Sequence, residues 1–221
     1  MTKFTSPQFS SLLERLFQET TAISPDSSIF LSQLSEADRQ RLMRSKTEYL
    51  ALYSGLKHLP LAVSRETGLL LYMLARASKA RSIVEFGTSF GVSTLHLAAA
   101  LRDNGGGLLI TTEFEPSKVA RARANLEEAD LIDLVEIREG DALQTLAQDM
   151  PDTIDLLLLD GAKALYPDIL NLLESRLRPG ALIIADNSGY SPEYLAKVRS
   201  AANGYLSLPQ PEDVELSLRL F

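Results

Sequence analysis

The chain has 221 residues, of which 45% are hydrophobic and 23% charged, a composition typical of a globular protein. It has no cysteine and only two histidines, which excludes a disulfide scaffold, a thiolate metal site and a multi-histidine metal centre within one chain. The net charge of −7 and the lack of a basic stripe argue against nucleic-acid binding. No apolar run approaches a membrane span and no signal-peptide core is present, so we expect a cytoplasmic protein without membrane contact.

Residues 1–60 are expected to form an N-terminal helical cover over a main domain at 61–221. Pro7 is a helix-start signal, and apolar residues recur at helical spacing after it. Ser35 begins a capping box that opens a second amphipathic segment, which ends near Gly55. Neither helix can bury its apolar stripe alone, so we expect both to pack on the main domain. A substrate lid or a dimer surface is the alternative interpretation.

The main domain shows alternating β and α patterns, which indicate a parallel sheet with helices on both faces. It begins with Leu69–Leu74, which is apolar all round and therefore predicts a buried helix. Two final runs without a helix between them predict an antiparallel pair. The expected strands are Ser82–Phe86, Leu108–Thr112, Leu134–Ile137, Ile154–Leu159, Ala181–Ala185, Tyr205–Leu208 and Val214–Leu220, and the expected helices are Val92–Leu101, Pro116–Ala129, Ala142–Gln148, Pro167–Leu177 and Pro192–Ala202.

Ligands of such sheets bind beyond the carboxyl ends of the strands, so the residues that follow each strand are candidates for a site. After the first strand, Glu85 and Ser93 bracket a turn that contains Gly87 and Gly91. Glycines between a strand and a helix allow close approach of a ligand to the backbone. The spacing is GxxxG and not the GxGxxG of dinucleotide-binding proteins, and a tight turn without a ligand is the alternative.

Acidic residues follow the second and third strands. Glu113 could accept both hydroxyls of a ribose, with Glu115 as the competing candidate. Glu115 lies beside Pro116, which better suits a carboxylate at a helix N-terminus. Asp141 could cap the next helix, accept a hydrogen bond from an adenine amino group, or do both.

Two carboxylates and an amide follow the fourth and fifth strands: Asp160, Asp186 and Asn187. If these strands are neighbours, the three oxygens converge, and two close carboxylates repel unless a proton or a cation bridges them. Oxygen ligands of this kind suit Mg²⁺. The alternative is that the aspartates end strands and cap helices. Lys163 taken alone indicates a solvated surface charge.

Together these motifs resemble the cation-dependent S-adenosylmethionine (SAM) O-methyltransferases of the catechol and caffeoyl-CoA type, over roughly Val63 to Phe221. The resemblance implies a Rossmann-like class I methyltransferase fold: a seven-stranded, mostly parallel sheet with an antiparallel C-terminal strand and helices on both faces. It implies SAM and Mg²⁺, or another divalent cation, as cofactors, and methyl transfer to a hydroxyl of a catechol-like small molecule. It also permits a homodimer.

The resemblance further implies a role for individual residues. Lys163 and Asp160 would be catalytic, with Lys163 as the general base, and Tyr166 fits the family's D-x-x-K-x-x-Y run. The metal ligands would be Asp160, Asp186 and Asn187. The cofactor would be bound by Val63, Glu85, Gly87, Thr88, Gly91, Ser93, Glu113, Asp141, Ala142 and Asp160.

The sequence departs from the family pattern at two places. Ala162 stands where many members have a second acid, and the loop after Asn187 lacks the Thr-Leu-Trp of the caffeoyl-CoA branch, which leaves the acceptor open. The alternative functions are a metal-independent methyltransferase, an NAD-dependent oxidoreductase, which the GxxxG turn and the Asp160, Asp186 and Asn187 set argue against, and a non-catalytic cofactor-binding protein.

Overall fold

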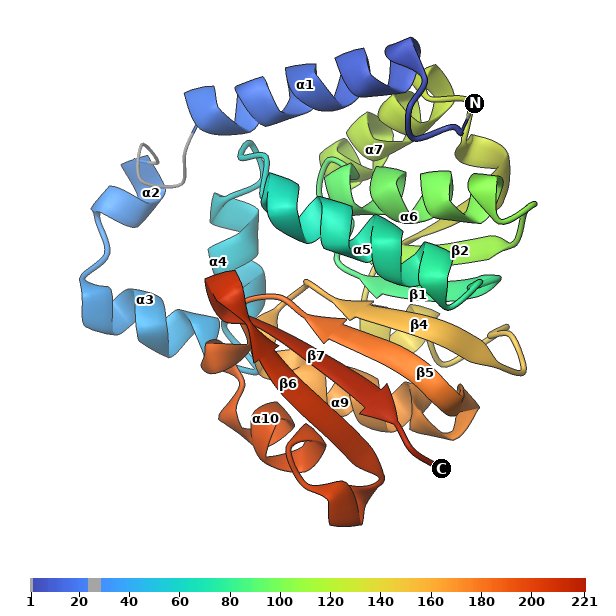
Figure 1. The fold of residues 1–221 in the computed structure, drawn as a ribbon. Coiled ribbons are helices and arrows are strands. Elements are labelled where there is room, and N and C mark those ends of the chain that lie inside the picture. Colours follow the sequence, from blue (N-terminus) through green and yellow to red (C-terminus); the bar gives the residue numbers. More distant parts are fainter. Residues whose placement is uncertain (1, 24–28) are drawn as a thin grey trace.

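A seven-stranded sheet in the order β3-β2-β1-β4-β5-β7-β6 runs through the centre of the molecule (Figure 1). The computed structural model describes residues 2–23 and 29–221. Only β7 runs against its two neighbours, which confirms the expected mostly parallel sheet and the antiparallel final pair. The strands are β1 Ser82–Phe86, β2 Leu108–Glu113, β3 Val135–Glu139, β4 Ile154–Leu159, β5 Leu177–Ala185, β6 Tyr205–Gln210 and β7 Val214–Arg219.

Helices cover both faces of the sheet and close two separate apolar cores. The central strand β4 is apolar along most of its length because it is covered on both sides. One face carries α1 Pro7–Ala22, α5 Arg65–Ala77, α6 Val92–Asp103 and α7 Pro116–Glu128, and the other carries α8 Ala142–Thr145, α9 Tyr166–Leu173 and α10 Pro192–Val198. None of the helices in residues 2–23 and 29–221 has the length and apolar character needed to cross a bilayer.

Helix α1 packs on the main domain, as expected. Ser6 caps its N-terminus, and its apolar stripe lies in the same core as α5, α6 and α7. Under this stripe His96 of α6 is buried against the rings of Phe4, Phe9 and Phe17. Because burial disfavours the charged imidazole, the pKa of His96 falls to about 4.

The second N-terminal segment is a chain of short helices and not one continuous helix. It forms α3 Glu36–Met43 and α4 Tyr49–Gly55, and the short helix α2 Ile29–Ser32 precedes it. Ser35 caps the start of α3 by accepting a hydrogen bond from the backbone of Asp38, which is one of the two bonds of the expected capping box. Leucines of these helices form a third, small core. Figure 1 shows the three helices standing beyond the carboxyl ends of the central strands, so they border the predicted site.

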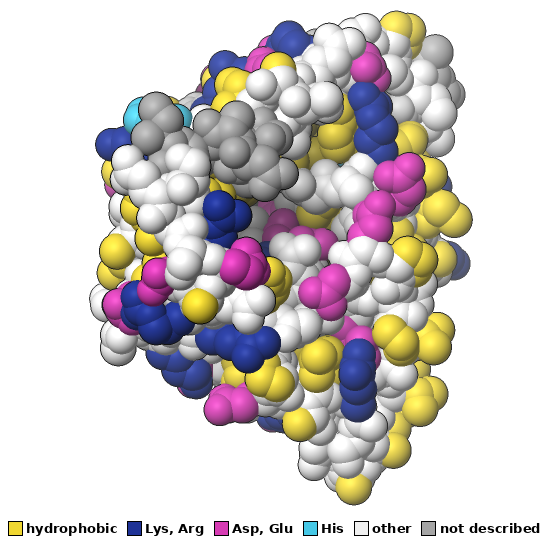
Figure 2. Space-filling view, turned by 90° about the vertical axis from the view of Figure 1, so that its left-hand side faces the viewer, with side chains coloured by type: hydrophobic (Ala, Val, Ile, Leu, Met, Phe, Trp, Pro, Cys, Tyr) yellow, Lys and Arg dark blue, Asp and Glu magenta, His cyan; other side chains and the backbone are white. Residues whose placement is uncertain are grey.

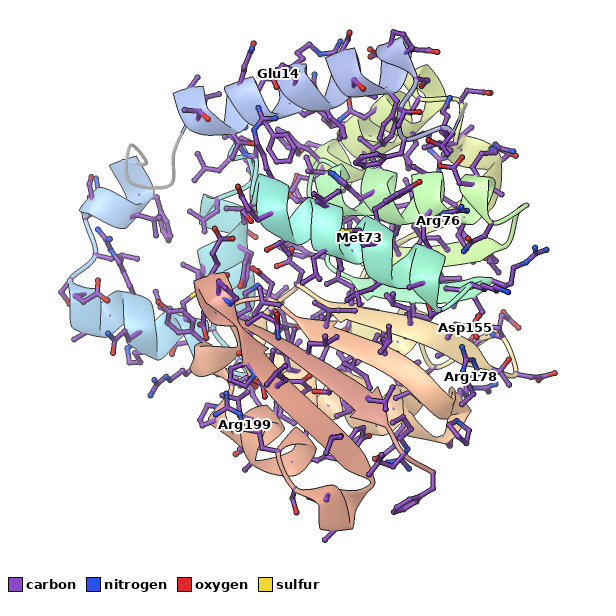
Figure 3. The ribbon with its side chains drawn as sticks, viewed as in Figure 1. Glu14, Met73, Arg76, Asp155, Arg178 and Arg199 are labelled. Atoms are coloured by element: carbon purple, nitrogen blue, oxygen red, sulfur yellow. The ribbon has the colours of Figure 1, made fainter. Side chains whose placement is uncertain are left out.

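The expectation of all-round burial for Leu69–Leu74 is wrong. Only Thr67, Gly68, Leu71 and Ala75 of α5 are buried, whereas Leu69 and Met73 are 45% and 57% exposed. Figure 3 shows Met73 on the outer side of α5. The helix packs on α6 through one face, and nothing among the described residues covers the other.

Candidate active site

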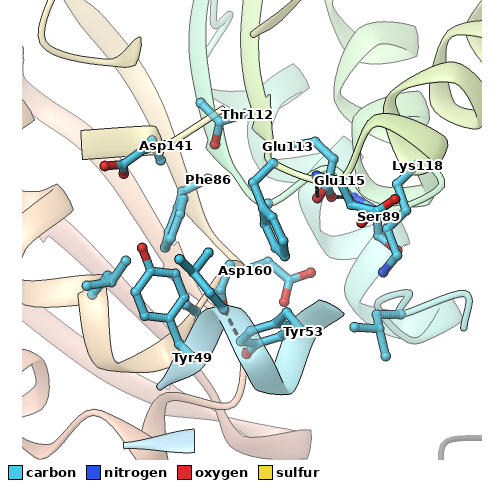
Figure 4. A pocket seen from close by; sticks show the side chains of 18 of the residues that line it. Tyr49, Tyr53, Phe86, Ser89, Thr112, Glu113, Glu115, Lys118, Asp141 and Asp160 are labelled. Atoms are coloured by element: carbon cyan, nitrogen blue, oxygen red, sulfur yellow. Dashed lines mark hydrogen bonds between the residues drawn. The ribbon is translucent and has the colours of Figure 1, made fainter. Parts of the chain in front are cut away.

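A cavity of about 300 Å³ lies at the carboxyl ends of the parallel strands, beneath α4. Figure 2 shows this face of the molecule hollowed, with acidic side chains in and around the hollow. Its walls come from the loops after β1, β2, β3 and β4 and from the N-terminal segment (Figure 4). The lining residues are Tyr49, Leu50, Tyr53, Leu61, Phe86, Gly87, Ser89, Thr112, Glu113, Phe114, Glu115, Lys118, Gly140, Asp141, Ala142, Asp160, Gly161, Ala162 and Leu165.

The turn after β1 passes close to the end of β4. Gly87 has a φ of +102°, and a Cβ there would lie 2.7 Å from the backbone of Asp160, so only glycine fits. Gly91 has a φ of +85° and begins α6. Thr88 is buried, and its hydroxyl donates to the carbonyl of Thr112 at 2.9 Å. Of these three predicted cofactor residues, Gly87 lines the cavity and the other two hold the turn in place.

Glu85 and Ser93 lie behind the turn and contact each other. The carboxylate of Glu85 is fully buried and accepts hydrogen bonds from the hydroxyls of Ser93 and Thr94. Burial raises the pKa of Glu85 to about 7, even though these hydrogen bonds oppose the shift. Val63 is also buried. These three predicted cofactor residues are outside the cavity lining, and their binding roles stay predictions.

Glu113 holds its carboxylate at the wall of the cavity through two backbone hydrogen bonds. Oε2 accepts from the amide of Ser89 at 2.8 Å, and Oε1 accepts from the amide of Glu115 at 3.0 Å. Burial raises the pKa of Glu113. Glu115 instead caps α7 and accepts from both the amide and the hydroxyl of Ser117. The interpretation of Glu115 as the helix cap is therefore confirmed, and Glu113 has the fixed orientation that a ligand site requires.

The loop after β3 forms the opposite wall. Asp141 caps α8 by accepting from the amide of Leu143 at 3.0 Å, and both Asp141 and Ala142 line the cavity. The cap and a ligand contact remain compatible. The nearby hydroxyl of Thr112 is buried at the cavity wall without a hydrogen-bond partner in the described chain. A ligand with polar groups at this end would satisfy it.

Asp160 and Asp186 meet at the ends of β4 and β5, which are hydrogen-bonded neighbours. The ammonium of Lys163 lies between them, 2.8 Å from Asp160 Oδ1 and 3.9 Å from Asp186 Oδ2. Burial, and then the charge of Asp160, raise the pKa of Asp186 to about 7. Burial alone would lower the pKa of Lys163, but Asp160 and the other neighbours raise it well above its ordinary value. Asn187 follows in a left-handed conformation with φ +48°.

The residues at this second end of the site fit a hard divalent cation. Asp160, Asp186 and Asn187 offer only oxygen donors, and the two crowded carboxylates already attract a positive charge. Among residues 2–23 and 29–221, no group of three or more histidine, aspartate or glutamate side chains is placed to hold a metal ion, so the amide of Asn187 would have to complete such a set.

The buried Tyr166 and the exposed Asp213 hold the chain around Asp186. The hydroxyl of Tyr166 donates to the carbonyl of Asp186 at 2.8 Å. The carboxylate of Asp213 accepts from the amide of Gly189 at 3.0 Å and from the hydroxyl of Ser188 at 3.4 Å. These contacts fix the backbone on both sides of Asn187.

Sequence reasoning missed the residues that close the cavity from above. Tyr49, Leu50 and Tyr53 of α4 line it, and the Tyr53 hydroxyl lies 3.4 Å from the carbonyl oxygen of Gly161 (Figure 4). The spacing of the two tyrosines by four residues places them on one face of a helix, which was the available signal. Lys118 of α7 was also missed.

Comparison with known proteins assigns the family. The family described as "Methyltransferase domain" matches residues 84–188. The catechol O-methyltransferase of Niastella koreensis is 37% identical over 130 residues, which cover 58% of this chain and 58% of that protein. A relative from Mycobacterium sp. (strain KMS) that also carries an O-methyltransferase name is 30% identical over 154 residues, which cover 64% of this chain and 68% of the relative. The chain belongs to the O-methyltransferase family.

The fold of this O-methyltransferase family member is also found in solved structures. The O-methyltransferase TomG of Streptomyces achromogenes, solved in complex with SAM, superposes with a TM-score of 0.65 and 25% identity. The match covers 92% of this chain and 99% of TomG. The sequence match to the Niastella protein spans less than two thirds of that protein's length.

Proposed function

We propose that this chain transfers a methyl group from SAM to a hydroxyl of a catechol-like small molecule, assisted by a divalent cation. The observation that carries the proposal is the placement of two kinds of acidic site at the two ends of the cavity. Glu113 presents a fixed carboxylate at one end, and Asp160 reaches the cavity from the Asp160–Lys163–Asp186 cluster at the other. Such a cavity suits a nucleoside at the first end and an acceptor oxygen at the second. Membership of the O-methyltransferase family supports the reaction.

The first half of the proposal concerns the cofactor, which would contact the cavity walls formed by the loops after β1, β2 and β3. When bound, SAM supplies a methyl group made electrophilic by its sulfonium. Glu113 would accept the ribose hydroxyls, because each of its oxygens keeps a lone pair beyond the one used by a backbone amide. Asp141 and Ala142 would border the adenine, and the TomG complex with SAM supports this use of the fold.

The acceptor half concerns the carboxylate cluster. Asp160, Asp186 and Asn187 would hold the cation, which when bound lowers the pKa of a coordinated phenol from its ordinary value of about 10. Two vicinal hydroxyls can chelate such a cation together, which supports a catechol-like acceptor. Lys163 would accept the phenol proton at Nζ. Because the carboxylates raise its pKa, this role requires their charges to be neutralised first.

One observation favours a second candidate, a metal-independent O-methyltransferase. Lys163 already neutralises part of the carboxylate charge from within the chain, with Nζ in contact with both aspartates. In this case the ammonium would orient the acceptor, and no divalent cation would be needed.

A matched pair of acceptors separates the two candidates. Catechol has vicinal hydroxyls, whereas resorcinol has the same composition but cannot chelate. We expect methyl transfer to catechol with Mg²⁺, loss of that transfer in EDTA, and little transfer to resorcinol in either condition. The Asp186→Asn variant should need a higher Mg²⁺ concentration for half-maximal rate. Equal rates with Mg²⁺ and with EDTA would reject the cation and support the second candidate.

A further inference from the structure

Lys118 is a buried cation in the wall of the cavity. It lies in the first turn of α7, and only 4% of its surface is exposed. Its Nζ is 3.4 Å from the Ser89 hydroxyl, and it forms no ion pair within residues 2–23 and 29–221. Lysine is rarely buried to this degree unless it is paired. The mechanism proposed above makes no use of it.

The surroundings of Lys118 do not supply the missing partner. The carboxylate of the neighbouring Glu113 is turned toward the backbone amides of Ser89 and Glu115 and forms no ion pair with Nζ, and the carboxylate of Glu115 caps α7. The ring of Phe90 has its centroid 5.9 Å from Nζ. Burial lowers the pKa of Lys118, against the opposing charges of Glu113 and Glu115. Figure 4 shows the side chain beside Ser89 at the edge of the cavity.

A buried ammonium next to a cavity indicates a ligand that brings an anionic group to that point, since an opposite charge there offsets the cost of desolvation. Under the proposed function, the cofactor carries one such group. Its adenosine is uncharged at neutral pH, whereas its amino-acid portion ends in an α-carboxylate. Ser89, the contact of Lys118, lies in the glycine turn between Gly87 and Gly91.

We propose that Lys118 binds the α-carboxylate of the cofactor's amino-acid portion. This inference rests on the proposed function and deepens it, because it assigns a specificity residue for the half of the cofactor that does not contain adenosine. Lys118 lies outside the set of cofactor residues that the family resemblance implies.

Two ligands that differ in the amino-acid portion provide the test. S-adenosylhomocysteine has the α-carboxylate, whereas 5′-methylthioadenosine keeps the adenosine and the thioether but lacks the amino acid. Isothermal titration calorimetry would measure both affinities for the full chain and for Lys118→Met. We expect the variant to bind S-adenosylhomocysteine about 10- to 100-fold more weakly, the range of one charge-assisted hydrogen bond. Its affinity for methylthioadenosine should stay within about threefold of wild type.

Two further variants make the test specific. Arg121→Met removes a positive charge from the same helix, but Arg121 is 42% exposed, pairs with Glu19 and lies outside the cavity lining. It should leave both affinities unchanged. Lys118→Arg keeps the charge and should recover part of the lost affinity for S-adenosylhomocysteine.

Three outcomes would overturn the inference, and they differ from one another. Equal weakening of both ligands in Lys118→Met would assign Lys118 to the ribose or to the support of Glu113. Unchanged binding of both ligands by Lys118→Met would remove it from the site. If the wild-type chain binds neither ligand, the proposed function fails and this inference fails with it, whereas the first two outcomes leave the proposed function intact.

Discussion

Replacing Glu113 by glutamine changes the charge of one cavity residue and almost nothing of its shape. In the structure its two oxygens accept separate backbone amides, from Ser89 at 2.8 Å and from Glu115 at 3.0 Å. A glutamine has one oxygen and one NH₂ group. Whichever way the side-chain amide is oriented, its NH₂ faces a backbone N–H, and one of the two hydrogen bonds is lost.

The expected magnitude follows from these contacts. A buried donor without a partner costs about 1–3 kcal/mol, partly offset because the neutral amide avoids the desolvation that raises the pKa of Glu113. We expect a net loss of about 1–2 kcal/mol in the free energy of unfolding and a fall in melting temperature of about 2–8 °C. Loss of charge-assisted bonds to the ribose hydroxyls should cost about 2 kcal/mol more in binding, or about 30-fold in Kd for S-adenosylhomocysteine.

Calorimetric titration with S-adenosylhomocysteine and a thermal melt measure the two effects separately. Glu115→Gln is the comparison variant, because Glu115 lines the same cavity and is only half-buried, but its carboxylate is held on Ser117 as the cap of α7. It should change Kd by less than about threefold. An unchanged Kd in Glu113→Gln, or a larger loss in the Glu115 variant, would refute the assignment of Glu113 to the cofactor. Since burial raises its pKa, affinity in the wild type should also fall as the pH is lowered and Glu113 becomes protonated.

Three further predictions concern other residues of the same architecture. Lys163→Ala should lower kcat by at least about 100-fold while the Kd for S-adenosylhomocysteine stays within about threefold, and an unchanged kcat would remove Lys163 from proton transfer. Tyr166→Phe leaves the Asp186 carbonyl unpaired, so urea unfolding should report a loss of about 1–2 kcal/mol, and an equally stable variant would contradict the anchoring role. The pKa of His96 falls from 6.5 to about 4 on folding, so its contribution to stability is complete above pH 6.5 and is lost as the pH falls toward 4, up to about 3 kcal/mol. Urea unfolding of His96→Gln should therefore be less pH-dependent than that of the wild type over this window, and an equal dependence would contradict the burial argument.

The sheet could be predicted from the sequence because its signals are local. A parallel strand covered on both faces is a continuous apolar run, as in Leu156–Leu159, and the helix starts carry their own capping residues. The prediction of all-round burial for Leu69–Leu74 failed because burial depends on neighbours that are distant in the sequence. Leu69 and Met73 are as apolar as a core residue, but no part of the described chain covers that face of α5.

Those site residues that directly follow a strand could be predicted from the sequence. Asp160 and Asp186 converge because consecutive strands β4 and β5 are also neighbours, and Pro116 correctly distinguished the helix-capping Glu115 from Glu113. The spacing of Tyr49 and Tyr53 indicates a shared helix face, but no local signal shows that this face, or Lys118 of α7, reaches the cavity. Only the folded chain brings Tyr53 and Lys118 to the cavity.

The central claim is that this chain moves a methyl group from SAM to an oxygen, and product mass tests it most directly. The full chain would be incubated with Mg²⁺, catechol and SAM carrying an isotope-labelled methyl group. The account predicts a catechol product that has gained a single labelled methyl group on oxygen, with one S-adenosylhomocysteine formed for each product. Binding of SAM without a labelled product from any vicinal diphenol, or a label found on carbon, would contradict it.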